Sequence, residues 1–76
     1  MSEKRVLSEM TVGERIKTIR ELHGMSAITL SDKTVLLLGR INQIESDESE
    51  PYAYEVSRIA DALGVTVKLL SGRVSV

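Results

Sequence analysis

Apolar residues recur along this chain in short helical repeats with breaks between them. The first repeat falls in residues 11–24, where Glu14 stands three residues after Thr11 and Gly24 follows His23. A threonine and a glutamate at this spacing form a capping box at a helix start, and glycine commonly ends a helix. The pattern therefore predicts a helix from Thr11 to His23. Its apolar stripe, at three- and four-residue spacing, consists of Val12, Ile16, Ile19 and Leu22.

The stretch from Ala27 to Glu45 carries two shorter repeats with a bend between them. Ser26 is a typical N-cap and predicts a helix of roughly two turns that ends at Lys33. A third helix is predicted over residues 36–45. When two short helices meet at an angle, one of them can be exposed to a ligand. The apolar residues expected inside are Leu30, Ile41 and Ile44.

The remaining repeats predict two further helices. The fourth helix is predicted from Pro51 to Leu63, because proline fits the first turn of a helix and Gly64 follows as a stop. Thr66 is the predicted N-cap of a short fifth helix. The apolar residues that the fourth helix is expected to bury are Val56, Ile59, Ala60 and Leu63, and the fifth helix carries Leu69 and Leu70.

Composition indicates one small, all-α domain. The chain has 76 residues, with no duplicated segment and no linker, so its core is small unless the chain dimerises. Phenylalanine, tryptophan and cysteine are absent, which leaves an aliphatic core without disulfides or thiolate metal ligands. No apolar run is long enough to span a bilayer, and we expect a cytoplasmic protein. The expected organisation is an arm over residues 1–10, a helical domain over 11–72 and a tail over 73–76.

The charge balance gives little support to nucleic-acid binding by itself. The formal net charge is −1 and the sequence pI is about 5.8. Proteins that bind nucleic acid usually present a basic face whose lysines and arginines displace counterions from phosphates. A near-neutral total still permits a local basic patch, so the distribution of charge matters more than its sum.

Four motifs, in order and at matching intervals, resemble the lambda-repressor and Cro-like (XRE) helix-turn-helix family. They are V-G-E-R-I-K-T-I-R over residues 12–20, G-M-S over 24–26, I-N-Q-I-E over 41–45 and I-A-D-A-L-G-V-T over 59–66. The resemblance extends from about Thr11 to Gly72. It implies a five-helix, all-α, lambda-repressor-like DNA-binding domain, with the third helix as the recognition helix. It also implies a structural ion pair between Arg20, late in the first helix, and Glu45 at the end of the third.

The chain departs from the family pattern at three places. Ala27 replaces the glutamine that usually holds a DNA phosphate, and Leu37, Leu38 and Gly39 replace the polar start of the recognition helix. Val35 occupies the turn position where the family usually has glycine. A β-branched residue is strained at positive φ, so we expect a remodelled bend or partly merged helices. One long helix is the alternative, favoured by the 4-3-4-3 stripe Leu30, Thr34, Leu37, Ile41 and Ile44.

The resemblance places the candidate DNA contacts on the second and third helices. In the major groove, arginine pairs with guanine, asparagine and glutamine pair with adenine, and an apolar side chain can rest on a thymine methyl. Phosphate contacts are expected from basic side chains and from the backbone N–H at the start of the second helix. The base-reading candidates are Leu38, Gly39, Arg40, Asn42 and Gln43. The phosphate candidates are Lys33, Arg15, Lys17 and the N–H of Ala27.

A protein-interaction module is the competing interpretation. The acidic run from Glu48 to Glu50 would repel DNA if it lay beside the phosphates. Three successive leucines, Leu36, Leu37 and Leu38, cannot all face inward from one helix, and an exposed leucine favours association. A degenerate helix-turn-helix of this kind would bind another protein through these leucines, as an antirepressor-like partner does.

Nothing in the sequence favours an enzyme, a metal site or a cofactor. His23, the single histidine, stands at a predicted helix end, where it is expected to interact with terminal carbonyl groups. No nucleophile-and-base spacing, glycine-rich phosphate loop or carboxylate pair is present.

The function predicted from these patterns is a sequence-specific DNA-binding transcriptional regulator that represses by occupying an operator. We expect a homodimer that places its third helices in adjacent major grooves, about one helical turn apart. The dimer contacts are expected at the fourth and fifth helices and the tail. They are Val65, Leu69, Leu70 and Val74.

Overall fold

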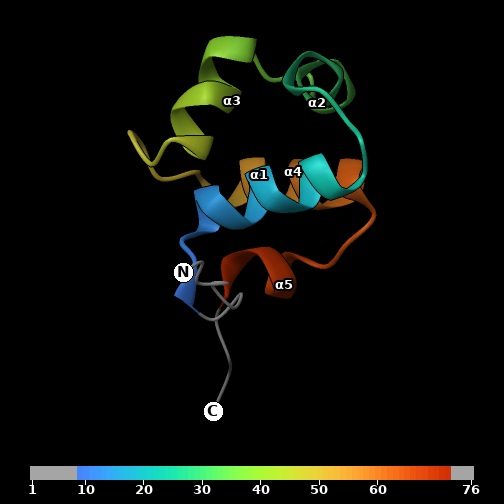
Figure 1. Ribbon diagram of the computed structural model, residues 1–76. Helices are drawn as coiled ribbons and strands as arrows, with labels where there is room; N and C mark the ends of the chain where they lie inside the picture. Colours follow the sequence, from blue (N-terminus) through green and yellow to red (C-terminus); the bar gives the residue numbers. More distant parts are fainter. Residues whose placement is uncertain (1–8, 73–76) are drawn as a thin grey trace, which may run out of the picture.

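The computed structural model describes residues 9–72, and within this range every regular element is an α-helix. The five helices are α1 (Val12–Leu22), α2 (Ala27–Thr34), α3 (Leu38–Glu45), α4 (Ala53–Leu63) and α5 (Val67–Ser71). Figure 1 shows α2 and α3 at one end, α1 and α4 in the middle and α5 at the other end. The predicted five-helix, all-α fold is confirmed. Most of the predicted arm, the tail and the dimer candidate Val74 lie outside the described residues.

Three helix starts follow from the predicted caps. The Thr11 hydroxyl accepts from the Glu14 N–H, and the Glu14 carboxylate accepts from the Thr11 N–H, both at 3.0 Å. The Ser26 hydroxyl caps α2 by accepting from the N–H of Thr29, and the Thr66 hydroxyl caps α5 in the same way. Each cap satisfies backbone donors that the first helical turn leaves without partners. The predicted starts of these three helices are confirmed.

The start of the fourth helix was predicted two residues too early. The helix begins at Ala53, and Tyr52 is its N-cap residue. The Glu55 carboxylate accepts from the Tyr52 N–H at 2.8 Å, which fixes the helix start after Tyr52. Pro51 precedes the cap and so does not enter the first turn.

The turn between α2 and α3 keeps the left-handed backbone that its valine disfavours. Val35 has φ 59° and ψ 29°, so the expected remodelled bend and the alternative of one long helix are both wrong. Side chains of α2 hold the turn: the Thr34 hydroxyl accepts from the Leu36 N–H, and the Ser31 hydroxyl donates to the Leu36 carbonyl. Leu37 is extended, so α3 begins at Leu38 and not at residue 36.

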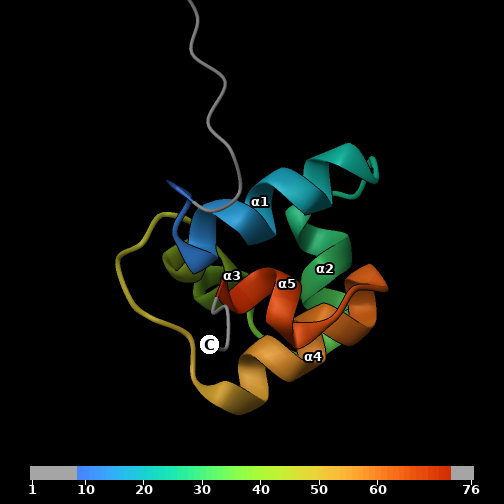
Figure 2. The same cartoon turned by 90° about the horizontal axis from the view of Figure 1, so that it is seen from below.

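The core is aliphatic, as the composition predicts. Figure 2, which views the molecule from below, shows α5 lying across the space between α1 and α4. Leu70 is fully buried there, so its predicted role in a dimer contact is wrong. Leu36 is also buried, which removes it from the predicted partner surface. The buried residues are Ile16, Ile19, Leu30, Leu36, Ile41, Ile44, Val56, Ile59, Ala60, Leu63 and Leu70.

Over residues 9–72, none of the helices combines the length and the apolar character that crossing a bilayer requires.

Candidate DNA-binding surface

Helix α3 buries one face and presents the other to solvent. Ile41 and Ile44 are 0% and 1% exposed, and together with Glu45 they form the inner face. The outer face, which we call the α3 outer face, consists of Leu38, Gly39, Asn42, Gln43 and Ser46, all of them exposed. Four of the five predicted base-reading residues therefore lie together on one accessible surface.

The predicted ion pair between Arg20 and Glu45 is present and buried. The Arg20 Nε and Nη2 atoms donate to the two Glu45 carboxylate oxygens at 2.8 and 3.0 Å. Arg20 also donates to the Met25 carbonyl at 2.7 Å. The hydrogen bond to Glu45 raises the pKa of the Arg20 guanidinium above its ordinary value. The pair joins the end of α3 to α1 and to the turn before α2, and so fixes the position of α3.

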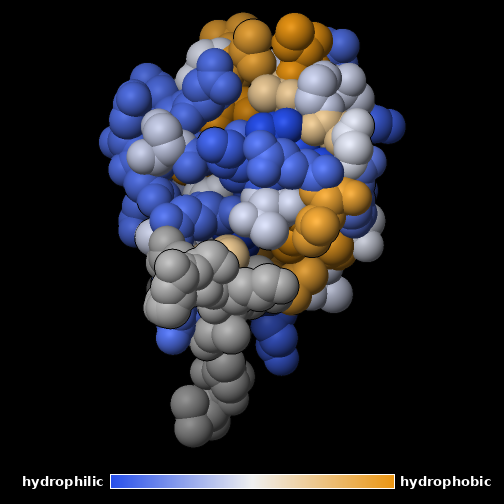
Figure 3. All heavy atoms as spheres, in the orientation of Figure 1, coloured by the Kyte–Doolittle hydropathy of each residue, from blue (hydrophilic) through white to orange (hydrophobic). Residues whose placement is uncertain are grey.

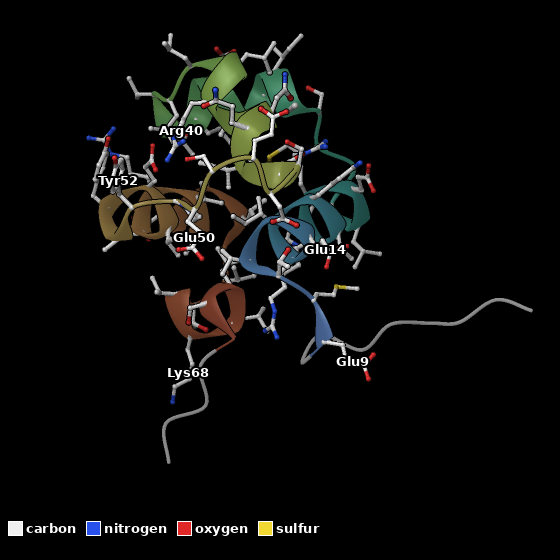
Figure 4. All side chains as sticks on the ribbon, turned by 90° about the vertical axis from the view of Figure 1, so that its left-hand side faces the viewer. Glu9, Glu14, Arg40, Glu50, Tyr52 and Lys68 are labelled. Atoms are coloured by element: carbon white, nitrogen blue, oxygen red, sulfur yellow. The ribbon has the colours of Figure 1, made fainter. Side chains whose placement is uncertain are left out.

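Arg40, the predicted guanine reader, faces α4 and not the α3 outer face. Its guanidinium donates to both Glu55 carboxylate oxygens at 2.8 and 2.7 Å, to Ser49 Oγ at 2.7 Å and to the Glu50 carbonyl at 3.1 Å. An arginine side chain has five N–H donors, so four of them are already used within the chain. Figure 4 shows Arg40 reaching from α3 toward Tyr52 at the start of α4. This arrangement does not support the expected base contact by Arg40.

The Arg40 and Glu55 side chains form a second ion pair that fixes α3. Glu55 is 2% exposed, and the guanidinium lies 5.5 Å from the Tyr52 ring centroid. The hydrogen bond to Arg40 holds the pKa of the Glu55 carboxyl below its ordinary value. One signal in the sequence indicates this orientation: Arg40 precedes the buried Ile44 by four residues, and such residues share a helix face.

Arg15 is also unavailable to a DNA phosphate. It is 6% exposed, and its guanidinium donates to the Met10 carbonyl at 3.2 Å and to the Leu69 carbonyl at 3.0 Å. Gly72 packs so closely against this guanidinium that a Cβ there would lie 2.7 Å from it. Arg15 therefore joins α1 to the end of α5, and the arrangement does not support its expected phosphate contact.

Two lysines, both predicted phosphate contacts, lie on the helices before α3. Lys17 of α1 lines a hollow with Asn42 and Ser46, and Lys33 of α2 lines a second hollow with Val35 and Arg58. Both lysines are exposed. Ala27, whose N–H is the other phosphate candidate, is half-buried in the first turn of α2. Arg58 is a further exposed cation, which the sequence pattern alone does not distinguish.

Four apolar side chains, one of them Leu38 of the α3 outer face, are exposed, and we call them the apolar edge. They come from α2, the turn and the start of α3, and Figure 3 shows the corresponding hydrophobic surface at the top of the molecule. The expectation that at least one of the three successive leucines is exposed is confirmed for two of them. The apolar edge consists of Ile28, Val35, Leu37 and Leu38, with exposed fractions of 61%, 82%, 81% and 38%.

The acidic loop after α3 is partly engaged with its own chain. The Asp47 carboxylate accepts from the Thr11 hydroxyl at 2.9 Å, which ties the loop to the start of α1. The Glu50 carbonyl accepts from Arg40. Figure 4 shows the Glu50 side chain below Arg40, on the side of the loop away from the exposed start of α3.

The remaining predicted site residues lie on parts of the chain other than α3. Val65 and Leu69, two of the dimer candidates, are half-buried and pack against the core, while Val67 on α5 is 45% exposed. His23 is exposed at the C-cap of α1. Among residues 9–72, no three histidine, cysteine, aspartate or glutamate side chains are grouped as metal ligands would be.

Comparison with known proteins places this arrangement in a family. A helix-turn-helix family model matches residues 16–70. The immunity repressor protein of Bacillus phage phi105 is 35% identical over 63 residues, which cover 83% of this chain and 44% of that protein. The chain therefore spans less than half the length of this relative.

Two solved structures share the fold. The P22 c2 repressor in complex with synthetic operator 9T has a TM-score of 0.76 at 24% identity, covering 82% of this chain and 94% of that one. The N-terminal DNA-binding domain of SinR from Bacillus subtilis has a TM-score of 0.73 at 27% identity, with coverage of 79% and 90%. Because the family match covers most of the described residues, the chain belongs to the XRE-type helix-turn-helix family of DNA-binding transcriptional regulators.

Proposed function

We propose that this chain is a sequence-specific DNA-binding transcriptional regulator, a repressor, that reads an operator with the α3 outer face. One observation carries the proposal: α3 is fixed from behind by two ion pairs while its opposite face is fully accessible. Arg20 with Glu45 and Arg40 with Glu55 are the two pairs. A rigidly held helix with a free face is suited to insertion into the major groove, because little ordering is required on binding.

Within this proposal each residue type has a distinct role. Asn42 and Gln43 offer amides that pair with adenine, and Gly39 has no neighbour within 4 Å of an added Cβ, so the helix backbone can approach the groove closely. Lys17 of α1 and Lys33 of α2 contact phosphates, and the Ala27 N–H contacts one from the start of α2. Arg40 and Arg15 hold the scaffold in place and contact no DNA.

We further propose that the repressor acts in the cytoplasm as a homodimer. Its two copies of α3 occupy adjacent major grooves about one helical turn apart, on a two-fold symmetric operator. Val65 and Leu69, together with the exposed Val67, are the apolar residues of the described chain that support a contact near α5. A dimer predicts selected sites with two inverted half-sites.

Selection of duplexes from a randomised DNA library, followed by gel-shift titration at several salt concentrations, tests the proposal. The chain should enrich a defined sequence, and log K should fall linearly with log salt. Gln43→Ala should relax the preference at one base pair. Lys33→Ala should weaken all duplexes alike and reduce the salt slope by about one. Failure to bind any duplex above background at low salt would exclude the proposed function.

A protein-interaction module is the second candidate, because the apolar edge is exposed beside a nearly neutral surface. Leu38→Asp tests it. Leu38 is exposed, so the Leu38→Asp domain should remain folded. Loss of a protein partner from this folded variant would favour the second candidate.

A further inference from the structure

The start of the recognition surface has no hydrogen-bonding side chain. Leu37 and Leu38 are exposed there, and Gly39 follows. Of the four arginines within residues 9–72, three are tied to groups of the same chain, and Arg58 belongs to α4. Three of these four guanidiniums are thus bonded within the chain, and that of Arg58 lies over the Tyr54 ring.

We propose that Leu37 and Leu38 read the C5-methyl groups of thymines, so that the operator half-site has thymine opposite the start of α3. This inference rests on the proposed function and specifies its ligand. Thymine is the one standard DNA base that presents a methyl group in the major groove. Leucine over a methyl group removes apolar surface from water on both sides.

The alternative bases make a poorer match to leucine. The major-groove edges of guanine, cytosine and adenine present polar groups, and burying such a group against leucine without a hydrogen bond costs free energy. Leu37 and Leu38 therefore select thymine both by attraction to its methyl group and by rejecting the other bases. This is discrimination without a charged contact.

The surroundings of the apolar edge favour DNA over a protein as the occupant. Asn42 and Gln43 continue the same helix surface with amides, which pair with adenine in the major groove. Lys17 is exposed beside Asn42 and Ser46, and Lys33 is exposed beside Val35 of the apolar edge, where each can contact a phosphate. Taken together, the face matches an A·T-rich half-site, thymine under the leucines and adenine under the amides.

Replacement of thymine by uracil isolates the methyl group, because uracil lacks only that group. Duplexes enriched from the randomised library are resynthesised with one deoxyuridine in place of each thymidine in turn, and their affinities are measured. Removing a methyl group that contacts Leu37 or Leu38 should weaken binding about fourfold. Substitutions elsewhere in the half-site should leave the affinity nearly unchanged.

A double-mutant cycle assigns the methyl groups to their leucines. In Leu38→Ala, and separately in Leu37→Ala, the sensitive thymine should become insensitive to deoxyuridine, because its apolar partner is gone. Leu22→Ala, which truncates a leucine of α1 that is 78% exposed, is the matched control and should keep the full sensitivity.

The outcomes separate this inference from the proposed function. Binding of a defined sequence with no thymine sensitive to deoxyuridine overturns the inference and leaves the function standing. Normal DNA affinity in both alanine variants overturns it as well, and loss of a protein partner from them would then assign the apolar edge to that partner. Absence of any DNA binding removes the proposed function and the inference together.

Discussion

Val35 adopts a backbone conformation that valine disfavours but that the fold requires. Its backbone lies in the left-handed region, where a β-branched side chain is disfavoured, although its side chain is 82% exposed and packs little. The hydrogen bonds that Thr34 and Ser31 make to Leu36 hold the turn in this conformation. The fold thus keeps a strained residue in the turn between α2 and α3.

Replacing Val35 with glycine should stabilise the domain by about 1 kcal/mol, because glycine adopts positive φ without steric cost and little packing is lost. The free energy of unfolding from urea denaturation measures the change. Val67→Gly is the matched control: this exposed valine is helical, so glycine there should lower stability by roughly the same amount. A destabilised Val35→Gly protein would show that the side chain has a role that its exposure conceals.

Glu55 gives the domain an acid-sensitive contact. Arg40 holds the pKa of the folded-state carboxyl below its ordinary value. A carboxyl with a lowered folded pKa contributes stability above its unfolded pKa and loses it as the pH falls through the folded pKa. Glu55→Gln should therefore be less stable than the original chain at neutral pH, and the difference should shrink as the solution becomes acidic.

Thermal denaturation midpoints measured against pH test this expectation. Glu48→Gln, at an exposed position of the acidic loop, is the control and should follow the original chain closely. If the gap between Glu55→Gln and the original chain stays constant from neutral to acidic pH, the ion pair does not supply the difference.

The sequence predicted the roles of residues whose partners are near them in the chain. It did not predict the roles of residues whose partners are distant in the chain. The caps at Thr11, Ser26 and Thr66 depend on residues three positions away, so they can be predicted from the sequence. Arg40 and Arg15 looked like free cations because Glu55 and the Leu69 carbonyl come near them only through folding. Arg20 and Glu45 were assigned correctly only through the family register.

At the scale of elements, the approach of α1 to the end of α3 sets the orientation of the recognition helix. Gly13 makes this approach close: a Cβ there would lie 2.0 Å from the Ile44 carbonyl oxygen and 2.6 Å from the Asp47 carboxylate. Neither group can move freely, because Ile44 is in α3 and Asp47 is bonded to Thr11.

Gly13→Ala should destabilise the domain by about 3 kcal/mol, because the added methyl group forces α1 away from α3. Gly39→Ala is the contrasting change, since nothing lies within 4 Å of its added Cβ. It should stabilise α3 by about 0.5–1 kcal/mol in urea denaturation while weakening DNA binding. Equal stabilities of the two variants would mean that α1 and α3 separate without cost.

Helix positions were predicted well where glycine or a cap marks the boundary and less well elsewhere. The turn after α2 lacks glycine, so the bend was predicted to be remodelled when it is not. The start of α4 was misplaced because Pro51 suggested a first turn, whereas the Glu55 carboxylate fixes the start at Tyr52. In both places a side-chain hydrogen bond outweighed the backbone preference of one residue.

At the scale of the whole molecule, the small core leaves little apolar surface to spare for a dimer. Leu70 was predicted to contact a second copy because so small a domain has little core to spare, but it is fully buried, and α5 packs against α1 and α4. Spacing within a five-residue helix is too short to fix its buried face, and this is why the assignment failed.

Leu70→Ala should lower the free energy of unfolding by about 2–5 kcal/mol, because it leaves a cavity in the core. Under conditions where the variant remains folded, its association measured by sedimentation should match that of the original chain. Lys68→Ala, at an exposed position on the same helix, should show little loss of stability. A stable Leu70→Ala protein with weakened association would return this residue to the dimer interface.

The two ion pairs behind α3 have an evolutionary consequence. They secure the helix through residues on its inner side, so the side chains on the opposite face can change without loss of these ion pairs. Exchanging those few side chains should redirect the domain to new promoters with little loss of folding stability. Lineages carrying this scaffold can thus acquire new target genes through single substitutions, without first passing through unstable intermediates.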